Sequence, residues 1–374
     1  MGSLRSSLPR EAYLDEAVYA AEQQAIFGTS WQTVARADQV PEPGDYLVVE
    51  PAGQSVLLIR GRDGALRAVR NLCRHRGAVL RRVDAGEGAG RFGSAVSCPY
   101  HGWTYGLDGR LVGAPNLPEM PDLTKAEYGL HPVRLEQWLG YVWLNLDPDA
   151  PSLAEQVEPE LVERFGPGQT LDRYRIDALL PGRTISYQVA ANWKCVVENF
   201  MECYHCGTLH PELTAALPQF ATGWGTVSGG VGAGAELADG LGSFSSSGVA
   251  VRRRLPGLLD QDDRLFFGVV LRPNTFLILV PDHVAVFRLA PHGPGHTTVE
   301  VDWLFDARAI ADPGFDPDDA VAILDVTNRQ DWDACERCQL GMASPAYQAV
   351  LVPSEHLITG FHDYVRDRLG DQLR

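Results

Sequence analysis

The sequence lacks the features that would direct it to a membrane or to nucleic acid. Its 374 residues contain no apolar run of about 18, so no membrane-spanning helix is expected. Residues 1–30 hold no apolar secretory core, which predicts a cytoplasmic protein. Positive charge is scarce, because 32 Lys and Arg stand against 48 Asp and Glu. The net charge of −16 argues against nucleic acid and anionic membrane surfaces as partners.

Cysteine is also sparse, with seven residues in the chain. Four of them form two Cys-x2-Cys pairs, Cys203/Cys206 and Cys335/Cys338. The 128 residues between the pairs argue against a zinc ribbon. Thiols in a cytosolic protein are reduced by default, so we expect these four as free thiols that pack on helices near the histidine-rich segment described next. A regulatory disulfide is the alternative.

The segment 192–210 concentrates metal-binding side chains. It contains His205 and His210, with Glu198 and Glu202 seven and three residues before the first histidine. On a helix, Glu198, Glu202 and His205 would share one face, and a turn after that helix can return His210 towards His205. Two imidazoles and one distant carboxylate form the facial triad of a non-heme Fe(II) centre. An amphipathic helix with two structural histidines is the alternative.

A second metal motif lies upstream and favours the metal interpretation. Cys73-x-His75 is followed, after 22 residues, by Cys98-x2-His101. Two cysteines on one iron and two histidines on the other are the ligands of a Rieske [2Fe–2S] centre. A structural zinc site is the alternative, but such sites usually pair Cys with Cys and His with His.

Together the two motifs resemble the oxygenase (alpha) subunit of Rieske non-heme iron oxygenases, over nearly the whole chain. The resemblance implies an α+β protein, with an N-terminal β-sandwich Rieske [2Fe–2S] domain and a helix-grip catalytic domain of antiparallel sheet and long helices that holds Fe(II). It also implies head-to-tail homotrimers, in which electrons pass from the cluster of one subunit to the iron of its neighbour. No flavin or nicotinamide motif is recognisable, so a separate NAD(P)H-dependent reductase, with or without a ferredoxin, must supply the electrons.

The chain divides into an N-terminal helical segment at 1–38 that packs on the catalytic domain, a Rieske domain at 39–150 and the catalytic domain at 151–374. The segment 88–93 matches G-x-G-x-x-G, but a strand pattern follows it, which excludes a dinucleotide site. The Gly/Ser-rich segment 222–248 is interpreted as a lid or channel loop. Strands are expected at 31–34, 46–49, 55–60, 66–71, 94–97, 141–146, 174–179, 184–189, 266–271, 275–280, 284–290 and 297–305, and helices at 10–28, 152–165, 318–347 and 355–369.

The resemblance also assigns the remaining site residues. Family members place the third iron ligand, an aspartate, four residues before a Cys or Met that is followed by Glu, and Asp331 matches this position; Asp333 is the alternative. Glu202 matches the carboxylate that bridges a Rieske histidine of one subunit and an iron ligand of the next. Asn199 matches a polar residue near the iron, and Glu198 is expected behind the ligands.

The context Glu-Cys-Tyr-His-Cys around Glu202 resembles monooxygenases of glycine betaine and carnitine. This resemblance predicts C–H hydroxylation that ends in oxidative N-demethylation of a quaternary ammonium compound such as a betaine. Hydroxylation or dioxygenation of an aromatic ring or a specialised metabolite is the alternative within the family, and a non-catalytic Rieske electron carrier is the alternative from another class. Aromatic rings often hold such cations, and the candidates are Phe220, Trp224, Phe266, Phe267 and Trp332.

Overall fold

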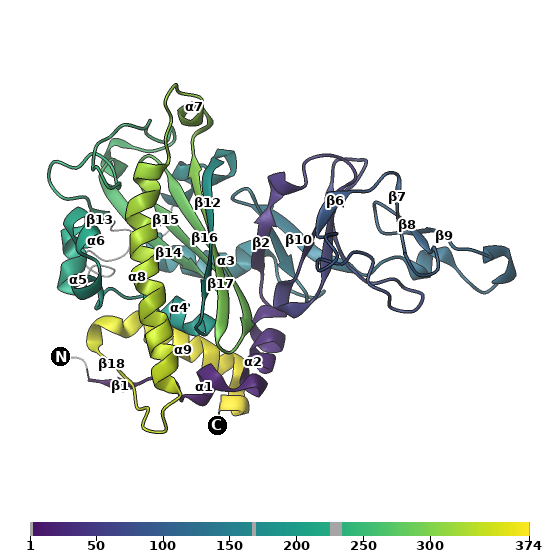
Figure 1. The fold of residues 1–374 in the computed structure, drawn as a ribbon, viewed down its shortest axis with the longest axis horizontal. Coiled ribbons are helices and arrows are strands. Elements are labelled where there is room, and N and C mark those ends of the chain that lie inside the picture. The colour runs from purple at the N-terminus through teal and green to yellow at the C-terminus, as the bar shows by residue number, and fades with distance from the viewer. Residues whose placement is uncertain (1–2, 167–169, 225–233, 374) are drawn as a thin grey trace. The chain divides into compact units, whose positions relative to one another are not determined.

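A computed structural model describes residues 3–166, 170–224 and 234–373. The chain forms two compact units, drawn in Figure 1. The smaller unit is Phe27–Leu153, and the larger one combines the residues up to Ile26 with those from Ala154 on. Residues 225–233 of the predicted lid loop lie outside the described part. Within that part, no helix is both long and apolar enough to cross a membrane.

The smaller unit is built from antiparallel strands, as predicted. A seven-stranded sheet has the order β2-β11-β10-β5-β4-β3-β6, and β7, β8 and β9 form a three-stranded sheet. Strand β4 shows why this unit folds as layers: Leu57 and Ile59 enter one apolar core, whereas Val56 and Leu58 enter another. The strands are β2 (Gln32–Arg36), β3 (Asp45–Val49), β4 (Val56–Arg60), β5 (Leu66–Arg70), β6 (Ala89–Arg91), β7 (Ala95–Ser97), β8 (Thr104–Gly106), β9 (Leu111–Gly113), β10 (Pro132–Trp138) and β11 (Tyr141–Asn145).

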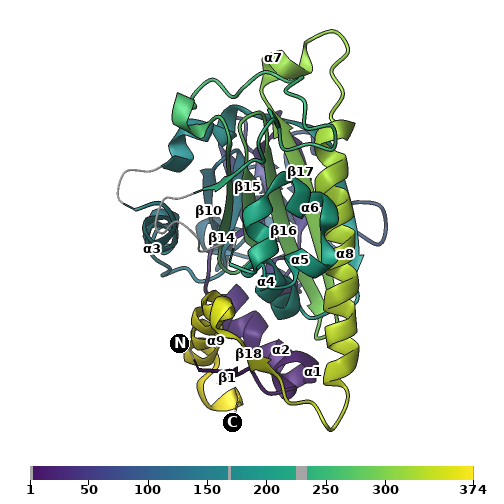
Figure 2. The same cartoon turned by 90° about the vertical axis from the view of Figure 1, so that its left-hand side faces the viewer.

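The larger unit contains a six-stranded antiparallel sheet in the order β12-β17-β16-β15-β14-β13. Figure 2 shows α4, α5 and α6 in front of one face of this sheet, with α8 along its β17 side and α3 beside β14. The predicted antiparallel sheet with long helices is confirmed. The elements are α3 (Leu153–Phe165), β12 (Leu180–Val189), α4 (Trp193–Phe200), α5 (Cys206–Leu209), α6 (Pro211–Ala216), β13 (Ala235–Glu236), β14 (Leu265–Leu271), β15 (Thr275–Leu279), β16 (Val284–Gly293), β17 (His296–Phe305), α7 (Ala307–Ile310), α8 (Asp318–Met342) and α9 (His356–Leu369).

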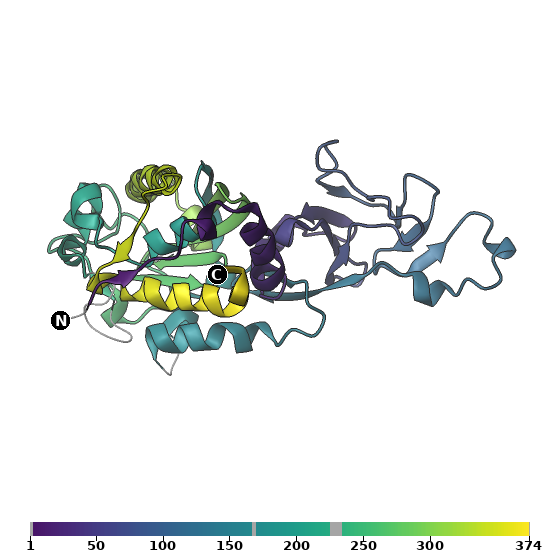
Figure 3. The same ribbon diagram turned by 90° about the horizontal axis from the view of Figure 1, so that it is seen from below.

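The part of the N-terminal segment up to Ile26 belongs to the larger unit, whereas its remainder, with β2, belongs to the smaller unit. The predicted helix at 10–28 is divided into α1 (Glu11–Leu14), α2 (Glu16–Glu22) and a π-helical turn, because Asp15 is extended and caps α2 by accepting a hydrogen bond from the Ala17 N–H. Strand β1 (Arg5–Ser6) pairs with β18 (Val350–Leu351), and Figure 3 shows this pair beside α9.

Two predicted elements are wrong. The strand expected at 174–179 is a pair of 3₁₀ turns, because Arg175 adopts a left-handed conformation with φ of 46° between them. The helix of the histidine-rich segment ends at Phe200, so Glu202 and His205 lie on a turn and not on a helical face. Their side chains meet across that turn instead.

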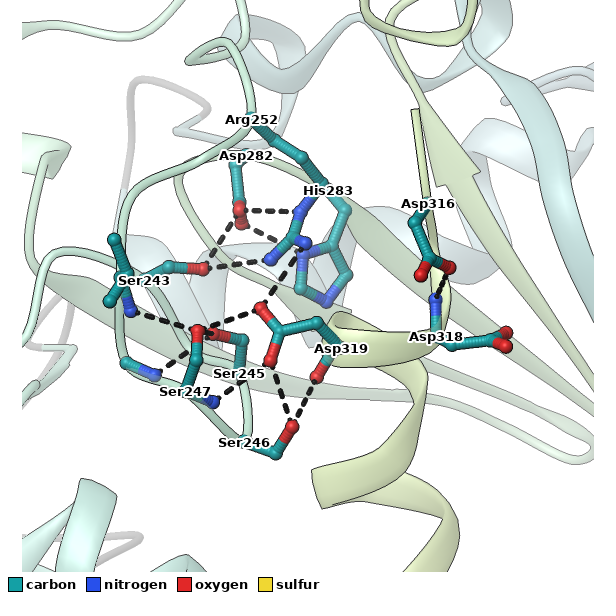
Figure 4. A network of polar contacts seen from close by, with 12 residues as sticks. Ser243, Ser245, Ser246, Ser247, Arg252, Asp282, His283, Asp316, Asp318 and Asp319 are labelled. Atoms are coloured by element: carbon teal, nitrogen blue, oxygen red, sulfur yellow. Dashed lines mark hydrogen bonds and ion pairs between the residues drawn. The ribbon is translucent and has the colours of Figure 1, made fainter. Parts of the chain in front are cut away.

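The part of the Gly/Ser-rich loop that follows residue 233 is tied to the end of the sheet. Arg252 forms ion pairs with Asp282 (3.0 Å) and Asp319 (3.5 Å), and Ser243 donates a hydrogen bond to Asp282 (Figure 4). The Arg252 side chain is 3% exposed, so these pairs are shielded from water. The Ser247 N–H also donates to the Asp319 Oδ1 at 2.8 Å, and this bond anchors the loop to the first turn of α8. A lid role for the loop stays a prediction.

Candidate active site

Two loops of the same backbone design present the Cys/His motifs of the smaller unit. The N–H of Cys73 bonds the carbonyl of Ala78, and the N–H of Gly77 bonds that of Cys73. The Cys98 loop repeats this pattern with Trp103 and Gly102. Gly77 and Gly102 have φ of 72° and 68°, a region that favours glycine, so both tight loops depend on these residues.

The four side chains of these loops gather at one place. Cys73 and Cys98 are buried, and the rings of His75 and His101 lie 4.7 Å apart. The Tyr105 hydroxyl is 3.2 Å from the Cys73 Sγ, and burial together with this contact raises the pKa of Tyr105, which therefore stays a neutral hydrogen-bond donor. Two buried thiols, two neighbouring imidazoles and a hydroxyl on sulfur fit a Rieske cluster.

In the larger unit, three side chains from separate elements converge. His205 lies directly before α5, His210 stands between α5 and α6, and Asp331 projects from the middle of α8. The Asp331 Oδ1 lies 2.9 Å from the His210 Nε2 and 3.2 Å from the His205 Nε2. One carboxylate and two imidazoles that share a point have the donor set of a 2-His-1-carboxylate iron site.

The electrostatics of this cluster favour a cation. Burial opposes a charged imidazole, but contacts with Asp331 and Glu202 raise the pKa of His205 to about 10. Burial also disfavours a charged Asp331, yet hydrogen bonds with His205 and His210 hold the pKa of that carboxyl below its usual range. The negative charge around the two imidazoles that favours a protonated His205 would equally favour a metal cation at this position.

Each ligand candidate has a partner that fixes its orientation. The Glu202 Oε1 bonds the His205 Nδ1, and the Asn199 Nδ2 donates to the Asp331 Oδ1 at 3.1 Å. The Gln330 Oε1 lies 2.6 Å from the His210 Nδ1. The sequence interpretation missed Gln330, whose only signal was its position next to Asp331. These bonds leave the Nε2 atoms of both histidines facing the carboxylate.

Two other candidates lie elsewhere. Asp333 forms an exposed ion pair with Arg337 on the outside of α8. Glu198 accepts hydrogen bonds from Tyr13 (2.6 Å) and His362 (3.0 Å), so it connects α4 to α1 and α9 and does not touch the iron-ligand candidates.

The expectation of four free thiols is wrong for the first pair, because Cys203 and Cys206 form a disulfide. The Cys206 sulfur lies 3.8 Å from the His205 Nε2 and close to His210, so distance alone would admit it as a metal ligand. Its bond to Cys203 uses the sulfur, and Asp331 is therefore the better third donor. Cys335 is buried beside the Cys195 carbonyl, and Cys338 is exposed.

A cavity of about 580 Å³ opens beside these residues. Its lining includes the three iron-ligand candidates, Glu202 and Asn199. Of the predicted aromatic residues, Phe220 and Phe266 line it, with ring centroids 5.5 Å apart. Phe267 instead packs on Phe165, Trp332 packs on Tyr187 and Trp224 is 47% exposed. A volume of this size suits a small organic substrate.

Family models match the two units separately. Residues 30–126 match the Rieske [2Fe-2S] domain, and residues 176–371 match the ring hydroxylating alpha subunit (catalytic domain). The chain belongs to the ring-hydroxylating alpha-subunit family. This alpha subunit is therefore an oxidoreductase that combines a Rieske [2Fe–2S] domain with a catalytic domain of the mononuclear-iron type.

Named relatives of this alpha subunit include the glycine betaine monooxygenase oxygenase subunit of Chromohalobacter salexigens. It is 30% identical over 372 residues, which cover 91% of this chain and 80% of the relative. The carnitine monooxygenase oxygenase subunit of Acinetobacter pittii is 35% identical over 205 residues, about half of each chain. The structure of the quaternary ammonium Rieske monooxygenase CntA with its substrate L-carnitine has a TM-score of 0.71 at 26% identity, and the match covers 98% of this chain and 96% of that one.

Replacing Gln330 with leucine is expected to lower the affinity of the alpha subunit for Fe(II) by roughly 10–100-fold, because the His210 Nδ1 loses its acceptor. An iron titration of the apo catalytic site measures this, with cluster content as the internal reference. Gln330→Glu keeps the acceptor and is expected to keep the affinity. Unchanged affinity in Gln330→Leu would contradict the positioning role.

Proposed function

We propose that this chain is the oxygenase component of a monooxygenase that removes an N-methyl group from a quaternary ammonium compound. Cys73, His75, Cys98 and His101 hold the [2Fe–2S] cluster of a Rieske domain at 39–150. His205, His210 and Asp331 hold Fe(II) in a catalytic domain at 151–374. The observation that carries the proposal is the convergence of Asp331 on both imidazoles at the wall of the cavity.

The electrons come from outside the chain. A separate NAD(P)H-dependent reductase, with or without a ferredoxin, reduces the cluster in the cytoplasm. In a head-to-tail homotrimer, Glu202 joins the Rieske histidine of a neighbouring subunit to His205. Its contact with the His205 Nδ1 supports one half of that bridge.

A quaternary ammonium substrate is supported by the cavity and by the named relatives. The carboxylates of Glu163 and Glu202 line the cavity, and such groups attract a cation. The Phe220 and Phe266 rings can face a trimethylammonium head. Glycine betaine and carnitine monooxygenase subunits are among the relatives, and glycine betaine and carnitine both carry this head.

The residues of the chain position the reactants. Fe(II) held by the ligand candidates, with O2, two electrons and two protons, would supply the oxidising power to insert one oxygen atom into a C–H bond, and the other oxygen atom would leave as water. Asn199 and Gln330 keep Asp331 and His210 in place, and the apolar lining limits water beside the reacting methyl group. The hydroxymethyl group would then lose its hydroxyl proton and leave as formaldehyde when the C–N bond breaks, and the bonding electrons would stay on a tertiary amine.

The protein is expected to contain about three iron atoms per chain, whereas an electron carrier without the catalytic iron would contain about two. Asp331→Ala is expected to lose one iron and keep the cluster absorption, while Asp333→Ala, a matched change on the same helix, keeps all three. Metal analysis combined with visible spectroscopy separates these outcomes. Equal iron content in both variants would contradict the role of Asp331.

Pre-reduced protein mixed with O2 and a betaine is expected to release formaldehyde in a single turnover. Oxygen insertion into an aromatic acid without formaldehyde would overturn the substrate proposal and leave both metal sites standing.

A further inference from the structure

One wall of the cavity, formed by α3 and β14, carries a shielded ion pair. Glu160 projects from α3, and Arg272 directly follows β14. The Arg272 Nε donates to the Glu160 Oε1 at 2.5 Å, and the Arg272 backbone N–H donates to the other oxygen at 3.0 Å. The carboxylate side chain is 11% exposed, whereas the guanidinium side chain is 29% exposed. Arg272 is therefore the more exposed member of the pair, and both residues line the cavity.

The Arg272 guanidinium is fixed but not saturated. Glu160 occupies its Nε, and the Tyr364 ring lies 4.8 Å from its central carbon. In the described part of the chain, no hydrogen bond leaves its Nη1 or Nη2. A guanidinium has five N–H donors, so a planar fork of four remains for a second acceptor. A fork held in place loses little entropy when it binds a carboxylate.

The charge of Arg272 is only partly cancelled by its partner. Burial raises the pKa of Glu160 to about 7, against the lowering effect of Arg272. Burial thus works against a full negative charge on Glu160, while the contacts with Arg272 favour that charge. Arg164 also lines this wall. Its Nε–H donates to the Gly268 carbonyl and its guanidinium lies over the Phe267 ring, so this side chain is directed towards β14.

We infer that Arg272 binds a carboxylate of the substrate, so that the cavity selects zwitterions that carry a trimethylammonium head and a carboxylate over simple ammonium cations. The inference rests on the proposed function, because it names the other end of the same substrate. The cationic head lies among the Phe220 and Phe266 rings and the carboxylates near the iron-ligand candidates, and Arg272 fixes the anionic end. Arg272 is thus a specificity-determining residue, with Glu160 as the group that positions it.

Arg272→Lys is the decisive variant, because lysine keeps the charge opposite Glu160 but has no planar fork. The reconstituted holoenzyme would be assayed for formaldehyde with trimethylammonium carboxylates and with trimethylammonium alcohols of matched length. For the carboxylates, KM is expected to rise roughly 10–100-fold with kcat retained, which corresponds to the loss of charge-assisted hydrogen bonds. For the alcohols, KM is expected to stay constant. Arg337→Lys, the same change at an exposed ion pair on α8, is the control.

The outcomes separate the two proposals. A loss confined to the carboxylates supports the subsite. An equal loss for both substrate classes, or none for either, overturns it, because Arg272 then only ties α3 to β14, while N-demethylation stands. Wild-type protein that releases no formaldehyde from any compound overturns the proposed function, and the inferred carboxylate subsite is then overturned as well.

Discussion

Replacing Glu202 with alanine is expected to reduce reductase-driven product formation at least roughly 100-fold while leaving the cluster absorption intact. The Glu202 Oε1 holds the His205 Nδ1, and its Oε2 accepts the Tyr204 N–H, so the carboxylate is fixed from both sides. In the proposed trimer this group joins the two metal sites. Its removal is expected to disconnect the electron donor from the iron and to leave the [2Fe–2S] ligands, which belong to the smaller unit, untouched.

The same substitution also removes the partner of His205, so weaker iron binding must be distinguished from lost electron transfer. The variant would therefore be loaded with iron and supplied with hydrogen peroxide, which delivers oxygen and two electrons without the cluster. We expect near-normal peroxide-driven product from Glu202→Ala, and partial reductase-driven activity from Glu202→Asp, which is one methylene shorter. Full reductase-driven activity in the alanine variant would contradict the bridging role of Glu202.

The metal-ligand candidates could be predicted because their signals are local or follow a fixed offset. His205 and His210 are close in sequence, and Asp331 was identified by its distance from Cys335 and Glu336. The structure then brings Asp331 within 3.2 Å of both imidazoles. Gln330 could not be predicted in this way. Its amide reaches His210 only because α8 packs against the α5–α6 turn, which no local pattern encodes.

The wrong predictions have related causes. Tyr174–Leu179 carries the apolar residues of a strand, but the backbone of Arg175 turns left-handed and buries Tyr174 and Ile176 in successive turns. Cys203 and Cys206 were predicted to be free thiols because a cytosolic protein was expected. The turn after α4 instead brings their Cα atoms to 5.0 Å, a distance that a disulfide can span. Among the aromatic candidates, alternation along β14 points Phe266 into the cavity and Phe267 away from it. The sequence pattern shows that alternation but not which face meets the cavity.

Lys194 presents the second large effect, on stability. Both Lys194 and Glu22 are fully buried, and their side chains form an ion pair between α4 and α2. The Asn192 Oδ1 accepts from the Lys194 Nζ at 2.9 Å, and the Trp193 Nε1 donates to the Glu22 Oε2 at 2.8 Å. Each charge in this cluster therefore has an opposite charge beside it. The ion pair links α2 of the N-terminal segment to α4, the helix that precedes His205 and His210.

Lys194→Met is expected to destabilise the larger unit by roughly 3–5 kcal/mol, because Glu22 remains as a buried carboxylate without its cation. At about 2–4 °C per kcal/mol for a unit of this size, its Tm would fall by roughly 6–20 °C in calorimetry. The double variant Glu22→Gln/Lys194→Met removes both charges and keeps an acceptor for the Trp193 N–H, so it is expected to recover most of the loss. If both variants lose the same stability, the cost comes from packing around Lys194 and not from an uncompensated charge. Recovery in the double variant means that Lys194, supported by Asn192 and opposite Glu22, secures the start of α4 through a buried ion pair.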